Sequence, residues 1–267
     1  MQTLKVTNPT FDMWRKCYFS KHLILTLFCG KLLYNRCSQN QKHLTITTMA
    51  FSRNTYSTEY ELIRTKLVTL CTQQSVKTIM FTACNEGDGV SKTALNLAIT
   101  LASIPSRKVL LLEIRPNEGP EKNSLFDKEA NDISALLDDY EKGLLNVNNP
   151  FHKLQGCGHD NLIMILAKIG MCPAPVLESE SFKALLSLLR EHFYYVILDA
   201  PPVTESSECL ALAAQADGVV LVLRADHTRK EVAKNALVKL ESTGVKLLGS
   251  VINMKKHHIP DFIYRRL

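Results

Sequence analysis

The 267-residue sequence lacks closely spaced cysteine pairs, because its eight cysteines are scattered and no two of them form a CxxC motif. Zinc ribbons and disulfide frameworks depend on such spacing, so neither class of protein is indicated. The sequence also lacks internal repeats. With 46% apolar and 22% charged residues, the chain can bury a full core, which favours a globular α/β protein over a disordered one.

A long hydrophobic run is missing as well. The stretch HLILTLFCG, between Lys21 and Lys31, has only nine residues, whereas a membrane-spanning helix needs about 20. No A-x-A cleavage site follows this stretch. The sequence therefore predicts neither a transmembrane span nor a secretory signal here.

Charge is not spread evenly along the sequence. Residues 1–48 hold seven Lys or Arg and one acidic residue, while residues 49–267 hold 25 of each sign. We predict a basic N-terminal extension (1–48) and one main domain (49–267) that does not bind nucleic acid. The extension is either an arm on an anionic membrane surface or a segment upstream of a true start at Met49.

Apolar runs and helical spacing alternate along the main domain. Runs typical of buried strands occupy residues 78–82, 108–114, 161–167, 194–200, 218–225 and 246–254. Helical spacing predicts helices at 58–71, 91–103, 133–137, 179–192, 207–214 and 229–242. This alternation is typical of an α/β fold, a parallel sheet flanked by helices on both faces. The binding crevice of such a sheet lies at the carboxyl ends of its strands.

The stretch NEGDGVSK joins the first of these strands to a helix. Gly87, Asp88 and Gly89 leave the strand, and the helix starts near Ser91. Successive backbone N–H groups and the helix N-terminus would then face one anion. The sequence therefore predicts a phosphate-binding loop.

Five blocks resemble the bacterial tyrosine autokinase family of capsule and exopolysaccharide assembly. In chain order they are YELIRTKL, NEGDGVSKTALNLA, VLLLEIRP, YYVILDAPPV and GSVINM. The segment PVLESESFKALLSLL, which precedes the fourth block, is also similar to a family segment. The resemblance covers nearly everything from about Thr58 to Leu267. It implies a P-loop NTPase fold of the MinD/ParA-like type and ATP or ADP with Mg²⁺ as the ligand.

The resemblance also implies which residues form the site. Glu113 and Asp199 stand at catalytic carboxylate positions, Ser91 and Asp199 at the Mg²⁺ ligands, and Tyr264 is the candidate phosphoacceptor. The nucleotide-binding residues that it implies are Gly87, Asp88, Gly89, Val90, Ser91, Lys92 and Asn253.

Departures from the family pattern concern charge at the phosphate site. Val90 stands where the family has the lysine that reaches the β- and γ-phosphates, and Arg115 stands at the second carboxylate of the second strand. Lys92 and Arg115 are the candidates for a replacement cation. However, Lys92 lies two positions further along the helix and points about 200° away from position 90.

The leading helix departs from the family as well. The resemblance implies that a glutamate and two arginines link neighbouring subunits into a ring, but only Arg64 stands in register. Thr58 and Glu61 occupy the other two positions. A homo-oligomer is therefore possible, while the case for a ring is weaker.

Taken with the resemblance, these departures favour a degenerate, nucleotide-binding relative of the tyrosine autokinases. It would regulate or scaffold exopolysaccharide synthesis beside a membrane-bound polysaccharide co-polymerase, or chain-length determinant. We expect it in the cytoplasm, peripheral to the inner face of the bacterial inner membrane. Two alternatives stay open, namely an active autokinase or ATPase with an atypical loop and a MinD/ParA-like positioning ATPase.

Overall fold

The computed structural model describes residues 45–50, 56–115, 131–145, 161–168 and 173–255. The strands in these ranges are β1 (Thr45–Ala50), β2 (Thr78–Ala83), β3 (Val109–Arg115), β4 (Asn131–Asp132), β5 (Leu162–Lys168), β6 (Tyr195–Asp199), β7 (Gly218–Arg224) and β8 (Lys246–Lys255). The helices are α2 (Tyr56–Gln74), α3 (Val90–Ala102), α4 (Ile133–Glu141), α5 (Ala174–Leu177), α6 (Glu180–His192), α7 (Ser207–Gln215) and α8 (Lys230–Ser242).

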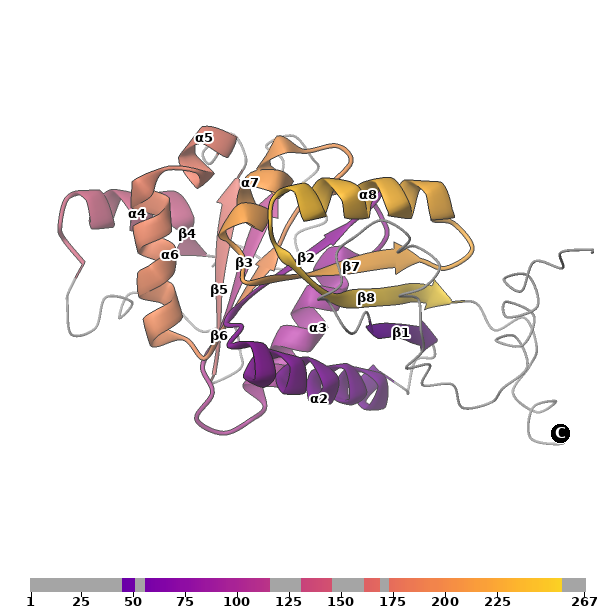
Figure 1. Cartoon of the computed structure of the whole chain (residues 1–267). Coiled ribbons are helices and arrows are strands. Elements are labelled where there is room, and N and C mark those ends of the chain that lie inside the picture. The colour runs from indigo at the N-terminus through magenta and orange to yellow at the C-terminus, as the bar shows by residue number, and fades with distance from the viewer. Residues whose placement is uncertain (1–44, 51–55, 116–130, 146–160, 169–172, 256–267) are drawn as a thin grey trace, which may run out of the picture.

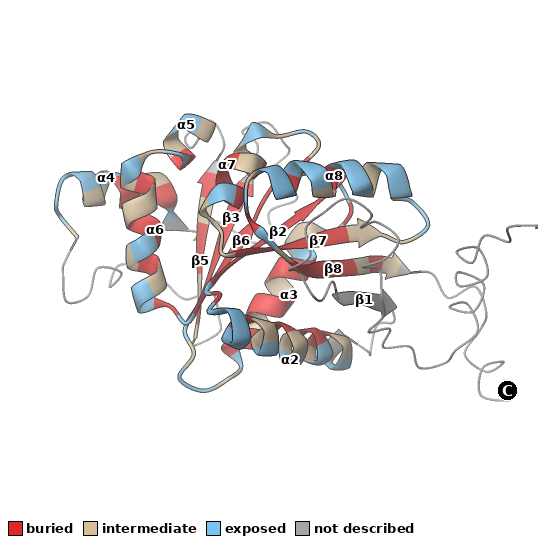
Figure 2. Ribbon diagram, in the orientation of Figure 1, coloured by how far each residue is buried: buried red, intermediate tan, exposed pale blue. Residues whose placement is uncertain are grey.

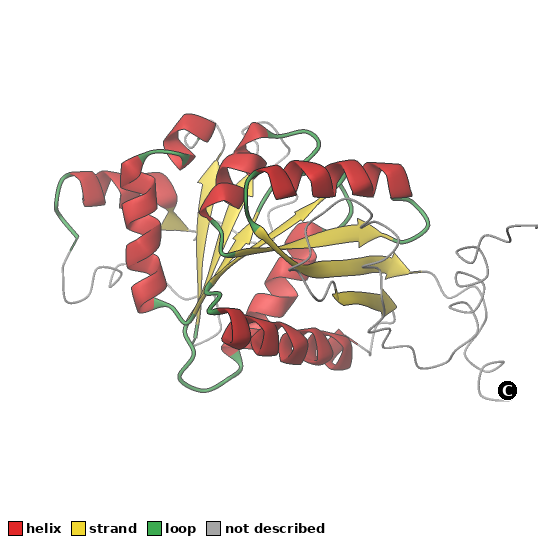
Figure 3. Ribbon diagram, in the orientation of Figure 1, coloured by secondary structure: helices red, strands yellow, loops and turns green. Residues whose placement is uncertain are grey.

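The strands form one sheet in the order β1-β8-β7-β2-β6-β3-β5-β4, and each pairing between neighbours is parallel (Figure 1). The parallel α/β fold expected from the sequence is thus confirmed (Figure 3). Each expected strand and helix occurs, with ends that differ by a few residues, and the helix expected at 133–137 extends to Glu141. The expected domain boundary between residues 48 and 49 falls inside β1.

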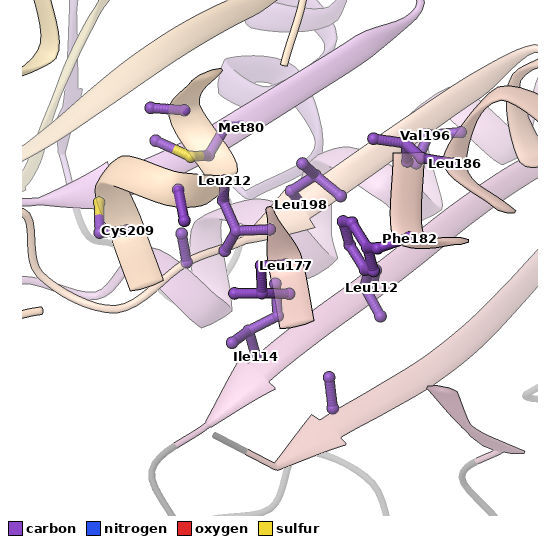
Figure 4. Packing of buried hydrophobic residues seen from close by; sticks show 14 of the residues in the cluster. Met80, Leu112, Ile114, Leu177, Phe182, Leu186, Val196, Leu198, Cys209 and Leu212 are labelled. Atoms are coloured by element: carbon purple, nitrogen blue, oxygen red, sulfur yellow. The ribbon is translucent and has the colours of Figure 1, made fainter. Parts of the chain in front are cut away.

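Hydrophobic layers cover both faces of the sheet because neighbouring residues of a strand point to opposite sides. In β2, Ile79 and Phe81 join a buried cluster with α2 and α3. Met80 faces the other way and joins a cluster with α4 to α8. Figure 2 shows the buried strands between the helices, and Figure 4 shows side chains of the second cluster from the strands and from α5, α6 and α7. None of the helices described is long and apolar enough to cross a lipid bilayer.

The amino edge of the sheet is held by an ion pair with added hydrogen bonds. Oδ2 of Asp217 accepts the backbone N–H groups of Lys77 (2.9 Å) and Thr78 (2.7 Å). Arg190 Nε donates to the hydroxyl of Thr78 (2.6 Å), and Arg190 Nη2 lies 3.4 Å from Asp217 Oδ1. These contacts fasten α6 and the α7–β7 connection to β2. A cavity of about 670 Å³ opens at this same edge, lined in part by Tyr195.

Candidate functional site

Two buried carboxylate residues stand in register at the carboxyl edge of the sheet. β6 lies between β2 and β3, and Asp199 at its end is in register with both Phe81 and Glu113. Neighbouring strands run about 4.8 Å apart, and Glu113 and Asp199 are only 2% and 4% exposed. Two buried carboxylates this close repel each other unless a cation lies near them. Their oxygens are the ligands that Mg²⁺ prefers, so this part of the site fits the metal that the family implies.

The segment after β6 runs along the end of β2. The Val203 N–H donates to the carbonyl of Ala83 (3.0 Å), and the Thr82 hydroxyl donates to the carbonyl of Pro201 (2.7 Å). These bonds hold residues 200–204 beside the start of the glycine-containing loop. The carboxylate of Asp199 and the loop therefore belong to one site.

The loop at residues 84–89 is organised around a buried carboxylate. Oδ2 of Asp88 accepts three hydrogen bonds, from the backbone N–H of Asn85 (3.2 Å), from its side-chain amide (3.4 Å) and from the hydroxyl of Thr228 (3.3 Å). Oδ1 of Asp88 is buried and accepts none. Asp88 is thus a structural centre of the loop as well as an expected binding residue.

Asn253 approaches the same loop from β8. Its side-chain amide donates to the carbonyl of Asp88 (3.1 Å), and its Oδ1 accepts the N–H of Met254 (2.8 Å). A Cβ on Gly89 would lie 2.2 Å from this amide nitrogen, and Gly89 has a φ of 89°. Only glycine fits here without strain. The contact of Asn253 with a nucleotide base stays a prediction, whereas its bond to the loop is observed.

The first turn of α3 opens toward the loop without a side-chain cap. Gly89 is the N-cap residue and makes no side-chain cap bond. The first N–H groups of a helix have no partner within the helix and favour an anion. Ser91 is half-buried in this turn and Lys92 is exposed. The role of Ser91 as a Mg²⁺ ligand stays a prediction.

Val90 packs against the apolar core instead of presenting a charge. Its half-buried side chain lies against the cluster that includes Tyr60, Ile63 and Leu97. Position 90 therefore supplies only apolar surface beside the loop. The side chain of Arg115, and Tyr264 as a whole, lie outside the described residues.

Two buried thiols lie near the carboxyl end of β2, that of Cys84 directly after the strand and that of Cys209 beside Thr82. Burial and, to a lesser extent, the charge of Asp88 raise the pKa of Cys84 from 9.0 to about 12. Burial raises the pKa of Cys209 to about 11, and its Sγ lies 3.3 Å from the hydroxyl of Thr82. Both thiols stay protonated at neutral pH, so neither is a nucleophile.

Arg64 of α2 pairs with Glu61 of the same helix, and Thr58 is exposed. The subunit-linking role that the resemblance implies for Arg64 stays a prediction.

The sequence does not predict the role of Thr228, which reaches Asp88 across 140 residues of chain. No local pattern marks such a contact.

No model of a protein family matches the chain. The chain is 29% identical over 223 residues to tyrosine-protein kinase YwqD of Bacillus subtilis, an alignment that covers 83% of this chain and 90% of that protein. It is 31% identical over 180 residues to the chromosome-partitioning ATPase Soj of Thermus thermophilus, covering 64% of this chain and 67% of Soj.

Solved structures agree on the fold. The kinase domain of Escherichia coli tyrosine kinase ETK superimposes with a TM-score of 0.62 at 19% identity, covering 84% of this chain and 88% of that domain. At this identity the likeness supports the fold alone.

Proposed function

Since this chain belongs to the bacterial tyrosine autokinase family, within the MinD/ParA-like superfamily of P-loop ATPases, we propose that it binds ATP or ADP with Mg²⁺. It acts as a regulatory or scaffolding protein in bacterial exopolysaccharide or capsule biosynthesis, with weak or absent phosphoryl transfer. The observation that carries this proposal is Val90, an apolar residue whose half-buried side chain packs against the core at the uncapped start of α3.

The proposed site has groups that would bind the phosphates and Mg²⁺, but it has no cation at position 90. The N–H groups at the start of α3 would face the phosphates, and Ser91 and Asp199 would hold Mg²⁺, which neutralises phosphate charge when bound. Glu113 adds a second carboxylate beside Asp199. Position 90 supplies no cation, and the loss of one such charge lowers rates by about 10²–10³-fold.

The proposed partner is a membrane-bound polysaccharide co-polymerase, and the proposed location is the inner face of the bacterial inner membrane. The five sequence blocks that resemble the tyrosine autokinases of capsule and exopolysaccharide assembly support the pathway. The basic excess in residues 1–48 supports attachment to an anionic surface. Formation of a homo-oligomer belongs to the same proposal.

Calorimetric titration with Mg-ADP and Mg-ATP tests the binding step. We expect saturable binding of both nucleotides, together with slow hydrolysis and no phosphotyrosine on Tyr264. Absence of binding would remove nucleotide sensing from the proposal and leave a scaffold. Efficient ATP-dependent phosphorylation of Tyr264 that is lost in Asp199→Ala would overturn the degenerate assignment.

The variant Val90→Lys tests the missing charge. Restoring the cation is expected to raise ATP hydrolysis at least tenfold, whereas Val90→Met, which has a long but uncharged side chain, leaves the rate low. A gain in both variants would point to repacking of α3 as the cause and not to charge.

An active autokinase or ATPase is the second candidate, because the relatives of this chain are tyrosine kinases. Lys92 is exposed in the first turn of α3 and would supply the cation, as would Arg115. This candidate predicts substantial hydrolysis by the natural chain, a loss in Lys92→Ala or Arg115→Ala, and no gain in Val90→Lys.

A MinD/ParA-like positioning ATPase is the third candidate, favoured by the identity with Soj. Against it, Asn85 and Val90 stand at the two lysine positions of the partitioning loop, and residues 49–267 carry balanced charge. ATP-dependent binding to DNA at physiological salt would favour this candidate over the other two.

A further inference from the structure

Two residues outside the loop form hydrogen bonds with one of its residues, Asp88. Thr228 lies in the turn between β7 and α8, and Asn253 lies on β8. Thr228 donates to the carboxylate of Asp88, and Asn253 donates to the carbonyl of Asp88. The side chain and the main chain of a single loop residue are therefore fixed from two separate elements.

The bond from Asn253 fixes the direction of the next N–H group. In a planar trans peptide the C=O and N–H point in opposite directions. Because the carbonyl of Asp88 points to Asn253, the N–H of Gly89 points away from β8. Within the described residues this N–H has no acceptor. It lies beside the uncapped first turn of α3 and is oriented by a side chain that the loop itself does not contain.

Thr228 connects the turn between β7 and α8 to the loop through hydrogen bonds. Its hydroxyl accepts the N–H of Arg224 (3.0 Å), and its own N–H donates to the carbonyl of Arg224 (3.0 Å). These bonds close the turn and direct the hydroxyl hydrogen to Asp88. The carboxylate needs this donor because it is buried and its other oxygen, Oδ1, has no partner.

We infer that Thr228 and Asn253 are positioning residues for polyphosphate binding, which hold the phosphate loop in its binding conformation without touching the phosphates. The inference rests on the proposed nucleotide-binding function. It also accounts for Gly89, because the amide of Asn253 occupies the space that a side chain at position 89 would need.

Thr228→Val removes the hydroxyl at nearly constant shape, and Thr228→Ser retains it. Thr243→Val is a matched control, because the hydroxyl of Thr243 also accepts a backbone N–H, from Val245, and donates to the carbonyl of Leu240. In calorimetric titrations with Mg-ADP, we expect Thr228→Val to weaken binding about tenfold, which corresponds to about 1.4 kcal/mol. Thr228→Ser and Thr243→Val should bind like the natural chain.

Hydrogen exchange in the nucleotide-free protein tests the same inference without a ligand. The peptide that contains Asn85 should exchange faster in Thr228→Val than in the natural chain, but not in Thr228→Ser or Thr243→Val. Equal Mg-ADP affinity and equal exchange in the natural chain and Thr228→Val would overturn the inference. If the natural chain binds no Mg-ADP, the proposed function fails, and exchange alone decides whether Thr228 holds the loop.

Discussion

At the scale of the residue, Gly89 carries two separate constraints. Its φ of 89° disfavours any side chain, and the amide of Asn253 blocks the position where a Cβ would lie. Gly87 also has a positive φ, of 78°, yet nothing lies within 4 Å of its Cβ position. A side chain at position 87 would therefore cause backbone strain alone, whereas one at position 89 would cause backbone strain and steric overlap.

Gly89→Ala should lower the free energy of unfolding by about 2–3 kcal/mol, and Gly87→Ala by about 1 kcal/mol. In a double-mutant cycle, Asn253→Ala should relieve part of the cost of Gly89→Ala and none of the cost of Gly87→Ala. Urea unfolding of the five variants measures these differences. Strict additivity of Gly89→Ala and Asn253→Ala would contradict the overlap.

The buried thiol of Cys84 makes stability depend on alkaline pH. Its pKa is about 12 in the folded protein, against 9.0 as the ordinary value, so the folded state favours the protonated thiol. This contribution is fully present below pH 9 and is lost as the pH rises from 9 toward 12. Between pH 8 and pH 10 the natural chain should lose about 1 kcal/mol more stability than Cys84→Ala. If the free energies of unfolding of the two proteins changed by the same amount between pH 8 and pH 10, this prediction would be wrong.

The sequence predicts residue roles only where a local pattern exists. The glycine spacing and the helix that follows indicate the loop, and the family blocks indicate Glu113 and Asp199. The contacts of Thr228 and Asn253 with Asp88 join residues separated by 140 and 165 positions. Such contacts depend on strand order, so spacing along the chain gives no sign of them.

At the scale of the element, the carboxyl and amino edges of the sheet have different roles. The carboxyl edge carries the loop and the paired carboxylates, whereas the amino edge is fixed by Arg190 and Asp217. Asp217→Ala removes the acceptor of two backbone N–H groups in β2 and should lower the free energy of unfolding by about 2 kcal/mol. The Kd for Mg-ADP should stay unchanged, since the loop lies at the other end of β2.

Calorimetric titration and urea unfolding of Asp217→Ala measure both quantities. Asp138→Ala serves as a control, because its exposed pair with Lys142 contributes little. A large loss of nucleotide affinity in Asp217→Ala, with stability retained, would mean that the two edges are coupled.

Apolar periodicity predicts the long elements well because burial on one face or on both leaves a repeating signature. It misses β4 because this strand is only two polar residues, Asn131 and Asp132. Asp132 also caps α4 by accepting the N–H of Ser134 (3.0 Å). Apolar periodicity also misses α5, because four residues are too few to show a helical period. Strand order is outside the reach of periodicity altogether.

At the scale of the whole molecule, one sheet separates two hydrophobic layers. Leu97 of α3 belongs to the layer with α2, and Leu198 of β6 belongs to the layer with α4 to α8. Both side chains are fully buried. Leu97→Ala and Leu198→Ala should each lower the free energy of unfolding by about 2–5 kcal/mol.

Because the strands are shared by both layers, each of these variants should shift one cooperative transition. Circular dichroism reports the helices, and fluorescence of a dye that binds apolar surface reports the core. Coincident curves are expected for both variants. A second transition in only one variant would mean that the two layers unfold separately.

The all-parallel order of the sheet has a consequence for how the chain is made. In the part of the chain that the structure describes, β2 pairs with β6 and β7, which follow it by more than one hundred residues. At a synthesis rate of about 5–20 residues per second, the backbone edges of β2 wait several seconds for their partners to leave the ribosome. During that delay α2 and α3 are the neighbours available to shelter its apolar side chains. The production of soluble protein in the cell should therefore depend more on these two early helices than their share of the finished core suggests.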